Sequence, residues 1–346
     1  MTRDPSSRGY LPSDPPDPLR SALHSFARRA RDKPALDRLD NAAAEAFDAF
    51  DAAGVDALLL KGPALARTLY TPVEHRGYSD VDLLVAPADI PMAERILGEL
   101  GYTNLADHLG IGDVAGTLSA ETWVGVATTA TAEAAPQIDL HWRLPGAQAS
   151  PESAWAALTR ERGVVGLAGR RVPTLAVDAL ALHLATHAAQ HGPGQRQPVE
   201  DLARGLERWA SDVWRGAARL ATEIEATEAF GAGLRLLPRG AAVASDLGLP
   251  GTGRLEWEIA HRDGRPRGTF HLQALSEART LRERASVLRR SLVPRREWIA
   301  CQYPWARGTR VRMIGARGLH VMRAPLWAAR AWRFRRRAGR AGVAGR

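Results

Sequence analysis

The apolar positions in the first third of the chain predict strands that alternate with helices. Residues 55–60 are mostly aliphatic and read as a buried strand, and residues 80–85 read as a second one. Residues 63–70 form a helix that starts with proline, which suits a first helical turn, and residues 87–100 form another with apolar side chains at helical spacing. Strands and helices in alternation indicate an α/β (α+β) fold.

The pattern then becomes weaker and changes character along the chain. We expect short strands at residues 103–106 and 122–127. Residues 163–174 read as a hairpin that turns around a glycine. From residue 177 to about 236, and again at 280–292, apolar residues recur at helical spacing. The second part of the chain is therefore expected to be mainly helical.

These patterns divide the chain into a mixed-sheet core flanked by helices and a mainly helical second domain. The first residues are rich in proline, serine and aspartate, a composition typical of flexible segments. The division runs as follows: a flexible N-terminus (1–18), N-terminal helices (19–53), a mixed-sheet core (54–146), a mainly helical domain (147–300) and a basic segment rich in arginine and tryptophan (301–346).

Two aspartates share one face of the strand at residues 80–85. Side chains alternate along a strand, so Asp80 and Asp82 project together while Val81 and Leu83 point into the core. Two carboxylates beside an apolar layer are costly unless positive charge lies between them. A divalent metal that carries a nucleoside triphosphate is the obvious candidate.

A third carboxylate comes from another alternating segment, at residues 137–142. This segment places Gln137, Asp139 and His141 on one face and apolar side chains on the other. Asp80, Asp82 and Asp139 could then bind two metals roughly 3.5–4 Å apart, an arrangement that supports attack of a hydroxyl on a phosphate. The chemistry that this arrangement indicates is nucleotidyl transfer.

These motifs, in this order, resemble a known superfamily. Gly62, the Asp80-x-Asp82 strand and Asp139 are similar to the signature of the polymerase-β-type nucleotidyltransferases. A longer set carries a narrower resemblance: Leu-Lys-Gly ending at Gly62, then Arg76 and Ser-Asp-Val-Asp-Leu-Leu-Val from Ser79, then Asp-Leu-His-Trp from Asp139. Within that superfamily the chain resembles a bacterial family of uncharacterised nucleotidyltransferases. The resemblance implies a nucleotidyltransferase-like mixed sheet and an enzyme that moves a nucleoside monophosphate (NMP) from a nucleoside triphosphate (NTP) to an acceptor hydroxyl or phosphate on a peptide, sugar or other small molecule.

The resemblance also implies site residues and cofactors. Mg²⁺ or Mn²⁺ would be the cofactor, and an NTP and an unidentified acceptor would be the substrates. The catalytic and metal-binding residues would be Asp80, Asp82 and Asp139, and the nucleotide-binding residues would be Lys61, Gly62, Arg76, Ser79 and His141.

Three of these residues carry open alternatives. The superfamily usually has Gly-Ser where this chain has Gly62-Pro63, and proline supplies neither a hydroxyl nor an N–H to phosphate. Lys61, one of only two lysines among 47 basic residues, could supply the charge instead. Arg76 could bind triphosphate oxygens or simply pair with an aspartate. A catalytically inactive nucleotide-binding relative therefore remains an alternative to the enzyme.

Composition favours an intracellular protein without disulfide bonds. The chain has a single cysteine, Cys301, so it forms no internal disulfide, and it starts without the apolar run of a signal peptide. No stretch approaches the roughly 18 apolar residues of a membrane span. The cytoplasm is therefore the expected location.

The net charge of +9 conceals a division of charge along the chain. Residues 279–346 contain 19 arginines and two glutamates, a balance of +17, which leaves the rest at −8. A concentrated basic segment attracts polyanions, so this segment could bind RNA, as in a toxin-like transferase that modifies tRNA. It could also lie on a membrane surface, or be a solvated extension.

The sequence also contains three histidines spaced four residues apart. His183, His187 and His191 therefore lie on one face of a helix. This face could line a cleft between domains, contact the nucleotide or acceptor, or bind a metal. The sequence does not choose among these three.

Overall fold

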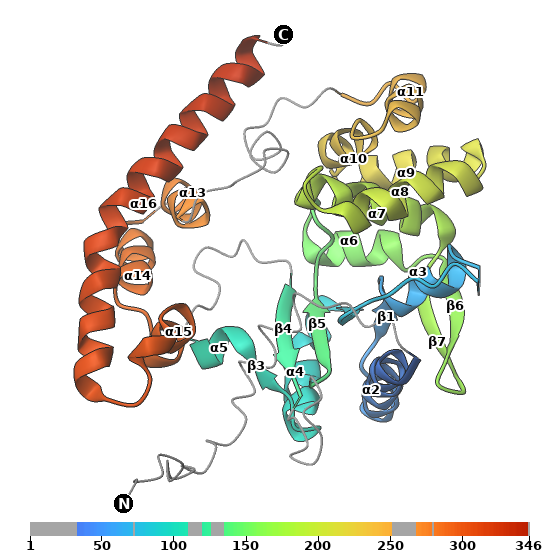
Figure 1. Cartoon of the computed structure of the whole chain (residues 1–346). Helices are drawn as coiled ribbons and strands as arrows, with labels where there is room; N and C mark the ends of the chain where they lie inside the picture. The colour runs from blue at the N-terminus through green and yellow to red at the C-terminus, as the bar shows by residue number, and fades with distance from the viewer. Residues whose placement is uncertain are drawn as a thin grey trace, which may run out of the picture.

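The computed structural model describes residues 33–71, 73–109, 120–125, 135–250, 268–278 and 280–344. The flexible segment expected at residues 1–18, and the part of the N-terminal helices before residue 33, lie outside the described residues. A mixed seven-stranded sheet forms the centre of the fold (Figure 1). Its strands are β1 (Ala57–Leu59), β2 (Val81–Val85), β3 (Thr103–Asn104), β4 (Ala120–Val124), β5 (Gln137–His141), β6 (Arg162–Leu167) and β7 (Arg170–Leu175).

The strand order of this sheet is β3-β4-β5-β2-β1-β7-β6. β2 pairs in parallel with β5 and antiparallel with β1, which brings strands that are far apart in the sequence together at the centre. The expected hairpin is confirmed as β6 and β7, and it joins the sheet through the pair Leu59 and Thr174. The sheet therefore extends across residue 146, where we expected the catalytic core to end.

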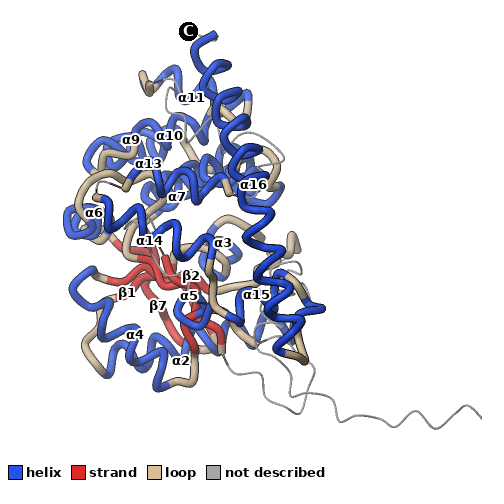
Figure 2. Tube along the Cα trace, turned by 90° about the vertical axis from the view of Figure 1, so that its left-hand side faces the viewer, coloured by secondary structure: helices blue, strands red, loops and turns tan. Residues whose placement is uncertain are grey.

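Helices cover both faces of the sheet, as the views in Figures 1 and 2 show. The α/β fold with a helical second part is confirmed. The helices between residues 33 and 246 are α2 (Lys33–Ala52), α3 (Pro63–Thr68), η1 (Pro87–Asp89), α4 (Ile90–Glu99), α5 (Leu105–Leu109), α6 (Pro151–Leu158), α7 (Val177–His191), α8 (Arg196–Arg208), α9 (Ser211–Glu223), α10 (Thr227–Leu234) and α11 (Pro238–Asp246).

Alternation along the strands separates two apolar cores. Leu59, Leu83 and Leu140 point to the face that α2 and α4 cover. Leu58 and Leu84 point to the opposite face, where they pack with α7 and the helices around it. Asp82 has the same parity as Leu84, because side chains two residues apart share a face. The polar face of the sheet therefore lies toward α7.

The C-terminal part of the chain forms a packed helical unit. Its own small core includes Ile299, Tyr303 and Met313. Arg295 donates a hydrogen bond to the Asp107 carbonyl of α5, so this unit also contacts the sheet domain. Among the described residues no helix is both long and apolar enough to cross a membrane. The helices are α13 (Thr269–Glu277), α14 (Leu281–Leu292), α15 (Arg296–Gln302), η2 (Pro304–Ala306) and α16 (Arg310–Ala344).

Candidate active site

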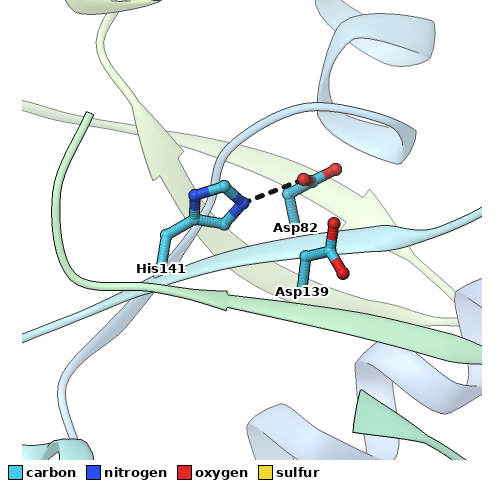
Figure 3. A group of neighbouring side chains, drawn as sticks. All are labelled: Asp82, Asp139 and His141. Atoms are coloured by element: carbon cyan, nitrogen blue, oxygen red, sulfur yellow. Dashed lines mark hydrogen bonds and ion pairs between the residues drawn. The ribbon is translucent and has the colours of Figure 1, made fainter. Parts of the chain in front are cut away.

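The parallel pairing of β2 with β5 builds the centre of the site. In this register Asp82 stands directly beside Asp139, and Leu84 beside His141. Paired residues of neighbouring strands point to the same face, so the two carboxylates meet on the side of the sheet that faces α7. Figure 3 shows both carboxylates turned toward the same space, with the His141 ring beside Asp82.

Asp82 is fully buried and has two basic partners on one oxygen. Its Oδ1 lies 2.8 Å from Lys61 Nζ and 3.0 Å from His141 Nε2. Lys61 lies two residues after the end of β1, and the intervening Leu60 donates its backbone N–H to the Asp82 carbonyl oxygen. The register of β1 against β2 therefore fixes the lysine beside the aspartate. In this structure Lys61 forms an ion pair with Asp82, and its contact with phosphate stays a prediction.

Two other carboxylate oxygens in the site lack a partner. Asp82 Oδ2 and Asp139 Oδ1 are buried and accept no hydrogen bond among the described residues. Buried anionic oxygens are costly unless a donor or a cation satisfies them. One ligand atom from each of Asp82, Asp139 and His141 lies within 4.8 Å of the others. These oxygen and nitrogen donors suit a divalent cation, so the residues present fit the metal that the sequence implies.

Asp80 is not a member of this close group. It lies in the bend just before β2, half-buried, as does Ser79. Burial, followed by the charge of Asp82, raises the pKa of the Asp80 carboxyl, so the two acids are electrostatic neighbours. The expectation that Asp80 and Asp82 both bind the metal stays a prediction. Asp139, rather than Asp80, is the aspartate that belongs to the close group with Asp82.

Burial and charge separate the pKa values of the two opposed aspartates. Burial alone would raise the pKa of Asp82, but the charge of Lys61 and the hydrogen bond from His141 lower it well below its usual range. Asp139 has no such partner, so burial and the charges of Asp80 and Asp82 raise its pKa to about 7. Burial opposes the charge of Lys61, yet the carboxylates outweigh it and raise the lysine pKa. Asp82 is thus held in its ionised form, while Asp139 keeps its proton to a higher pH than an ordinary aspartate does.

The turn after Lys61 requires glycine. Gly62 has a φ of 62°, and a Cβ atom there would lie 3.0 Å from the Asp80 carbonyl oxygen. This close approach packs the start of α3 against the strand that carries the aspartates. Pro63 occupies the first turn of α3, as expected, where its missing N–H costs no helical hydrogen bond.

Arg76 holds this turn from the loop between α3 and β2. Its Nη1 donates to the Gly62 carbonyl oxygen at 3.1 Å. Its Nε and Nη2 donate to the two carboxylate oxygens of Asp201 at 2.9 and 2.7 Å, a bidentate buried ion pair. Of the two expectations for Arg76, the structure shows the pairing with an aspartate.

Sequence reasoning missed Asp201 as a partner of this loop. Asp201 comes from α8 and also accepts hydrogen bonds from Tyr70 (2.5 Å) and Gln197 (2.9 Å). The sequence separates Arg76 from Asp201 by 125 residues, so no local pattern could have connected them. The signal present in the sequence was an acid at helical spacing from Pro198 and Gly205, with which Asp201 shares the buried face of α8.

The histidine face of α7 points toward the same region. The rings of His183 and His187 stack at 5.7 Å, and those of His187 and His191 meet edge to face at 4.5 Å. His183 is buried, and neither of its ring nitrogens has a hydrogen-bond partner among the described residues. Burial, then the charges of Lys61 and His141, lowers the His183 pKa to about 3. His183 is therefore a neutral group close to the aspartate site.

Comparison with known proteins gives one family and several structures. Residues 7–239 match the model of a family described as uncharacterised nucleotidyltransferase. None of the curated proteins matches the chain. The matched residues include all the site residues described above, from Lys61 to Asp201.

Three solved structures are similar to parts of this chain. The antibiotic-resistance factor ANT(2'')-Ia is 15% identical, with 55% of this chain and 94% of that chain covered and a TM-score of 0.35. The lincosamide antibiotic adenylyltransferase LnuA is 17% identical, with coverage of 46% and 90% and a TM-score of 0.29. An antigenic nucleotidyltransferase-like protein from Paracoccidioides brasiliensis is 13% identical, with coverage of 55% and 93% and a TM-score of 0.33.

Proposed function

Because the chain belongs to the family of uncharacterised nucleotidyltransferases, and is thus a transferase, we propose a metal-dependent reaction for it. The protein moves an NMP from an NTP to a hydroxyl or phosphate of a small acceptor such as a peptide or sugar. One observation carries the proposal: Asp82 and Asp139 each present a buried, unpartnered carboxylate oxygen in one space. We expect the reaction in the cytoplasm, where NTPs are available.

Asp82 and Asp139 would hold the divalent metal, and Asp80 would complete the carboxylate set. When bound, Mg²⁺ or Mn²⁺ supplies the positive charge that stabilises a reacting phosphate and lowers the pKa of an attacking hydroxyl. The asymmetry of the two aspartates gives them different roles. Asp82 is kept ionised by Lys61 and His141, so it is the permanent anion of the site. Asp139 would hold the metal through its unpartnered Oδ1 and help to deprotonate the acceptor hydroxyl; its raised pKa belongs to the metal-free protein, because a bound cation would offset the neighbouring carboxylates that raise it.

Lys61 would act as a cation that can be shared between Asp82 and the triphosphate. Its side chain is 15% exposed and carries the ammonium on a flexible stem, so the ammonium can rotate toward a phosphate oxygen without moving the backbone. Two cations next to one Asp82 oxygen would repel each other, which favours this transfer of Lys61 to phosphate once a metal is bound. His141 keeps its contact with Asp82 and orients that carboxylate.

The remaining nucleotide-binding residues lie around the turn after Lys61. Gly62 allows the backbone to approach Asp80, and Arg76 holds the Gly62 carbonyl in place. The guanidinium of Arg76 has N–H groups beyond those used in its three hydrogen bonds, and these remain for a phosphate oxygen. Ser79 precedes the aspartates in the same loop and would donate its hydroxyl to phosphate.

Incubation with α-labelled NTPs tests this function. The protein is mixed with Mg²⁺ or Mn²⁺ and with separate extracts of peptides, sugars and tRNA, and transfer of label is measured. We expect label on a small acceptor with wild-type protein and at least a 100-fold reduction with D82N or D139N, the magnitude for loss of an essential electrostatic group. The matched control is D37N, the same chemical change at an exposed residue of α2. Transfer by D82N and D139N that equals wild-type transfer would contradict the assignment, and label on tRNA alone would favour the tRNA-modifying alternative.

A further inference from the structure

One face of α16 carries a row of exposed apolar side chains. Of the thirteen large apolar residues that are exposed in the described part of the chain, ten lie between residues 281 and 332. On α16 they recur at intervals that keep them on one side of a helix. Figure 2 views the molecule from the side on which this helix lies. The exposed apolar residues of α16 are Val311 (79% exposed), Ile314 (69%), Val321 (44%), Met322 (70%), Leu326 (60%) and Trp332 (52%).

The other side of α16 is fixed to the protein. Met313 and Ala316 are buried in the core of the C-terminal unit. His320 lies within 2.8 Å of the Ser291 carbonyl oxygen of α14 through its Nε2, and its ring is 4.9 Å from those of Trp298 and Trp327. The expectation of a plain solvated extension is therefore wrong for this helix. Its docking presents the apolar row outward.

Arginines flank the apolar row on both sides. Arg312, Arg323 and Arg330 follow one another at spacings of eleven and seven residues, so they lie on one flank, and Arg310 and Arg317 lie on the other. All five are exposed. The sequence of α16 holds ten arginines and no aspartate or glutamate. From residue 310 to residue 330, an apolar strip thus lies between two rows of positive charge on the outer surface of this unit, and beyond it Arg336 lies over the Trp332 ring.

We propose that this surface of α16 binds an anionic lipid bilayer, with the helix lying in the plane of the membrane interface. An interfacial helix buries an apolar face to the depth of the acyl boundary and keeps its basic residues among the headgroups, and α16 has both features. Tryptophan is favoured at the same depth, which suits Trp332. The absence of a spanning helix from the described residues agrees with attachment on the surface rather than insertion across it.

Charge and apolarity together exclude the two competing occupants. A second copy that docked through its own α16 would bring its arginine rows against these, with no acidic residue on α16 to offset them. A nucleic acid would be held by the arginines but would leave Val311, Ile314 and Leu326 without an apolar partner, since it offers phosphates and base faces. Of these three occupants, the lipid surface is the one that offers both an apolar interior to the row and negative charge to the arginines.

Vesicle flotation with the full-length protein tests the proposal. Binding is compared on vesicles of phosphatidylcholine alone and of phosphatidylcholine mixed with phosphatidylglycerol, at low and high salt. The apolar variant is I314S/M322S/L326S. Its matched control is V73S/V164S/V177S, which removes the same number of exposed apolar side chains from the rest of the chain. A charge variant, R312Q/R323Q/R330Q, removes one basic flank.

We expect binding to the anionic vesicles only. The apolar variant should lose roughly tenfold or more in affinity, because three buried apolar side chains contribute more than one factor of ten. The charge variant should bind the vesicles more weakly, and its binding should depend less on salt. The valine control should bind like wild type. All substituted side chains are exposed, so each variant should fold, and circular dichroism of each variant is the check. Absence of binding to anionic vesicles would overturn the proposal. Binding of the apolar variant that equals wild-type binding would also overturn it, because contact through charge alone is the behaviour of a nucleic-acid site. A wild-type dimer that becomes monomeric in the apolar variant would overturn it as well.

Discussion

Lys61 Nζ lies 2.8 Å from Asp82 Oδ1, so the ammonium of the glycine turn and a carboxylate of the sheet form an ion pair at the centre of the site. His141 approaches the same oxygen, while Asp139, opposite on the next strand, has no comparable partner. The site is thus asymmetric before any substrate arrives. Removal of one aspartate or the other should therefore have opposite consequences for stability.

Asp139→Asn should stabilise the metal-free protein. Burial and neighbouring acids raise the Asp139 pKa to about 7, above its usual value near 3.8, so the charged form destabilises the fold. This penalty is absent below about pH 4, grows as the pH rises, and is complete above pH 7. Urea denaturation in EDTA should show D139N to be more stable than wild type by roughly 1–3 kcal/mol at pH 8 and equal to it at pH 4.

Asp82→Asn should have the opposite sign. It leaves Lys61 with a buried, unpaired charge, and loss of one partner of a buried pair costs on the order of 3 kcal/mol. The same urea titrations at pH 8 measure this loss. If D82N were as stable as D139N, the ion pair with Lys61 would contribute nothing.

Gly62→Ala should weaken the turn by more than backbone conformation alone explains. An alanine here would have to hold φ 62° and ψ −110°, outside the left-handed helical region that costs roughly 1 kcal/mol, and its Cβ would also lie 3.0 Å from the Asp80 carbonyl oxygen. Gly54→Ala is the matched control, because Gly54 has a φ of 73° but no atom near its Cβ position. We expect G62A to lose more stability than G54A, and to lose NMP transfer while G54A keeps it. Equal stability losses would show that the contact with Asp80 has no consequence.

The ion pair of Arg76 with Asp201 should couple the loop to α8. Each of R76M and D201L leaves a buried charge without its partner, which should cost roughly 3 kcal/mol or more. The double variant should lose less than the sum, with a coupling energy above about 2 kcal/mol. Arg160 and Glu223, an exposed pair, provide the control cycle, for which coupling below about 1 kcal/mol is expected. Similar coupling in the two cycles would mean that burial does not strengthen the Arg76 pair.

His183 should make the protein less stable in acid. Its pKa falls from the ordinary value near 6.5 to about 3 in the folded protein, because burial and the charges of Lys61 and His141 disfavour the protonated ring. The unfolded chain binds this proton first, so stability is complete above about pH 6.5 and is lost as the pH falls toward 3. Denaturation of H183L should lack this dependence, which amounts to at most about 1.4 kcal/mol per pH unit. The exposed His108 offers the control H108L, and equal pH profiles for both variants would contradict the burial of His183.

Local patterns in the sequence predicted the elements and the order of the site motifs. The hairpin of β6 and β7, the helices from α7 to α10 and the strand of Asp139 all occur where apolar spacing placed them. The strand parity of Asp82 and Asp139 was also evident, because a period of two is a local property. The family resemblance carried by these residues is confirmed by the match to residues 7–239.

Relations between distant segments were not predictable in the same way. The register that sets Asp82 beside Asp139, the capture of Arg76 by Asp201 and the docking of α16 through His320 all depend on tertiary contacts. No spacing in a single chain encodes such contacts, since each is chosen by packing of the whole core. For the same reason the sequence suggested a phosphate role for Lys61 and gave no sign of its ion pair with Asp82.

Titration with Mn²⁺, followed by electron paramagnetic resonance of the free ion, tests the central claim most directly, because it needs neither the acceptor nor the correct NTP. Wild-type protein, D82N, D139N and the exposed control D37N are compared in buffer at pH 8, with and without a non-hydrolysable ATP analogue. The account predicts Mn²⁺ binding by wild type and D37N that strengthens with the nucleotide analogue, and at least a tenfold loss of affinity in D82N and D139N. Binding of Mn²⁺ by D139N that equals that of wild type would contradict the claim that the opposed carboxylates of β2 and β5 hold the metal.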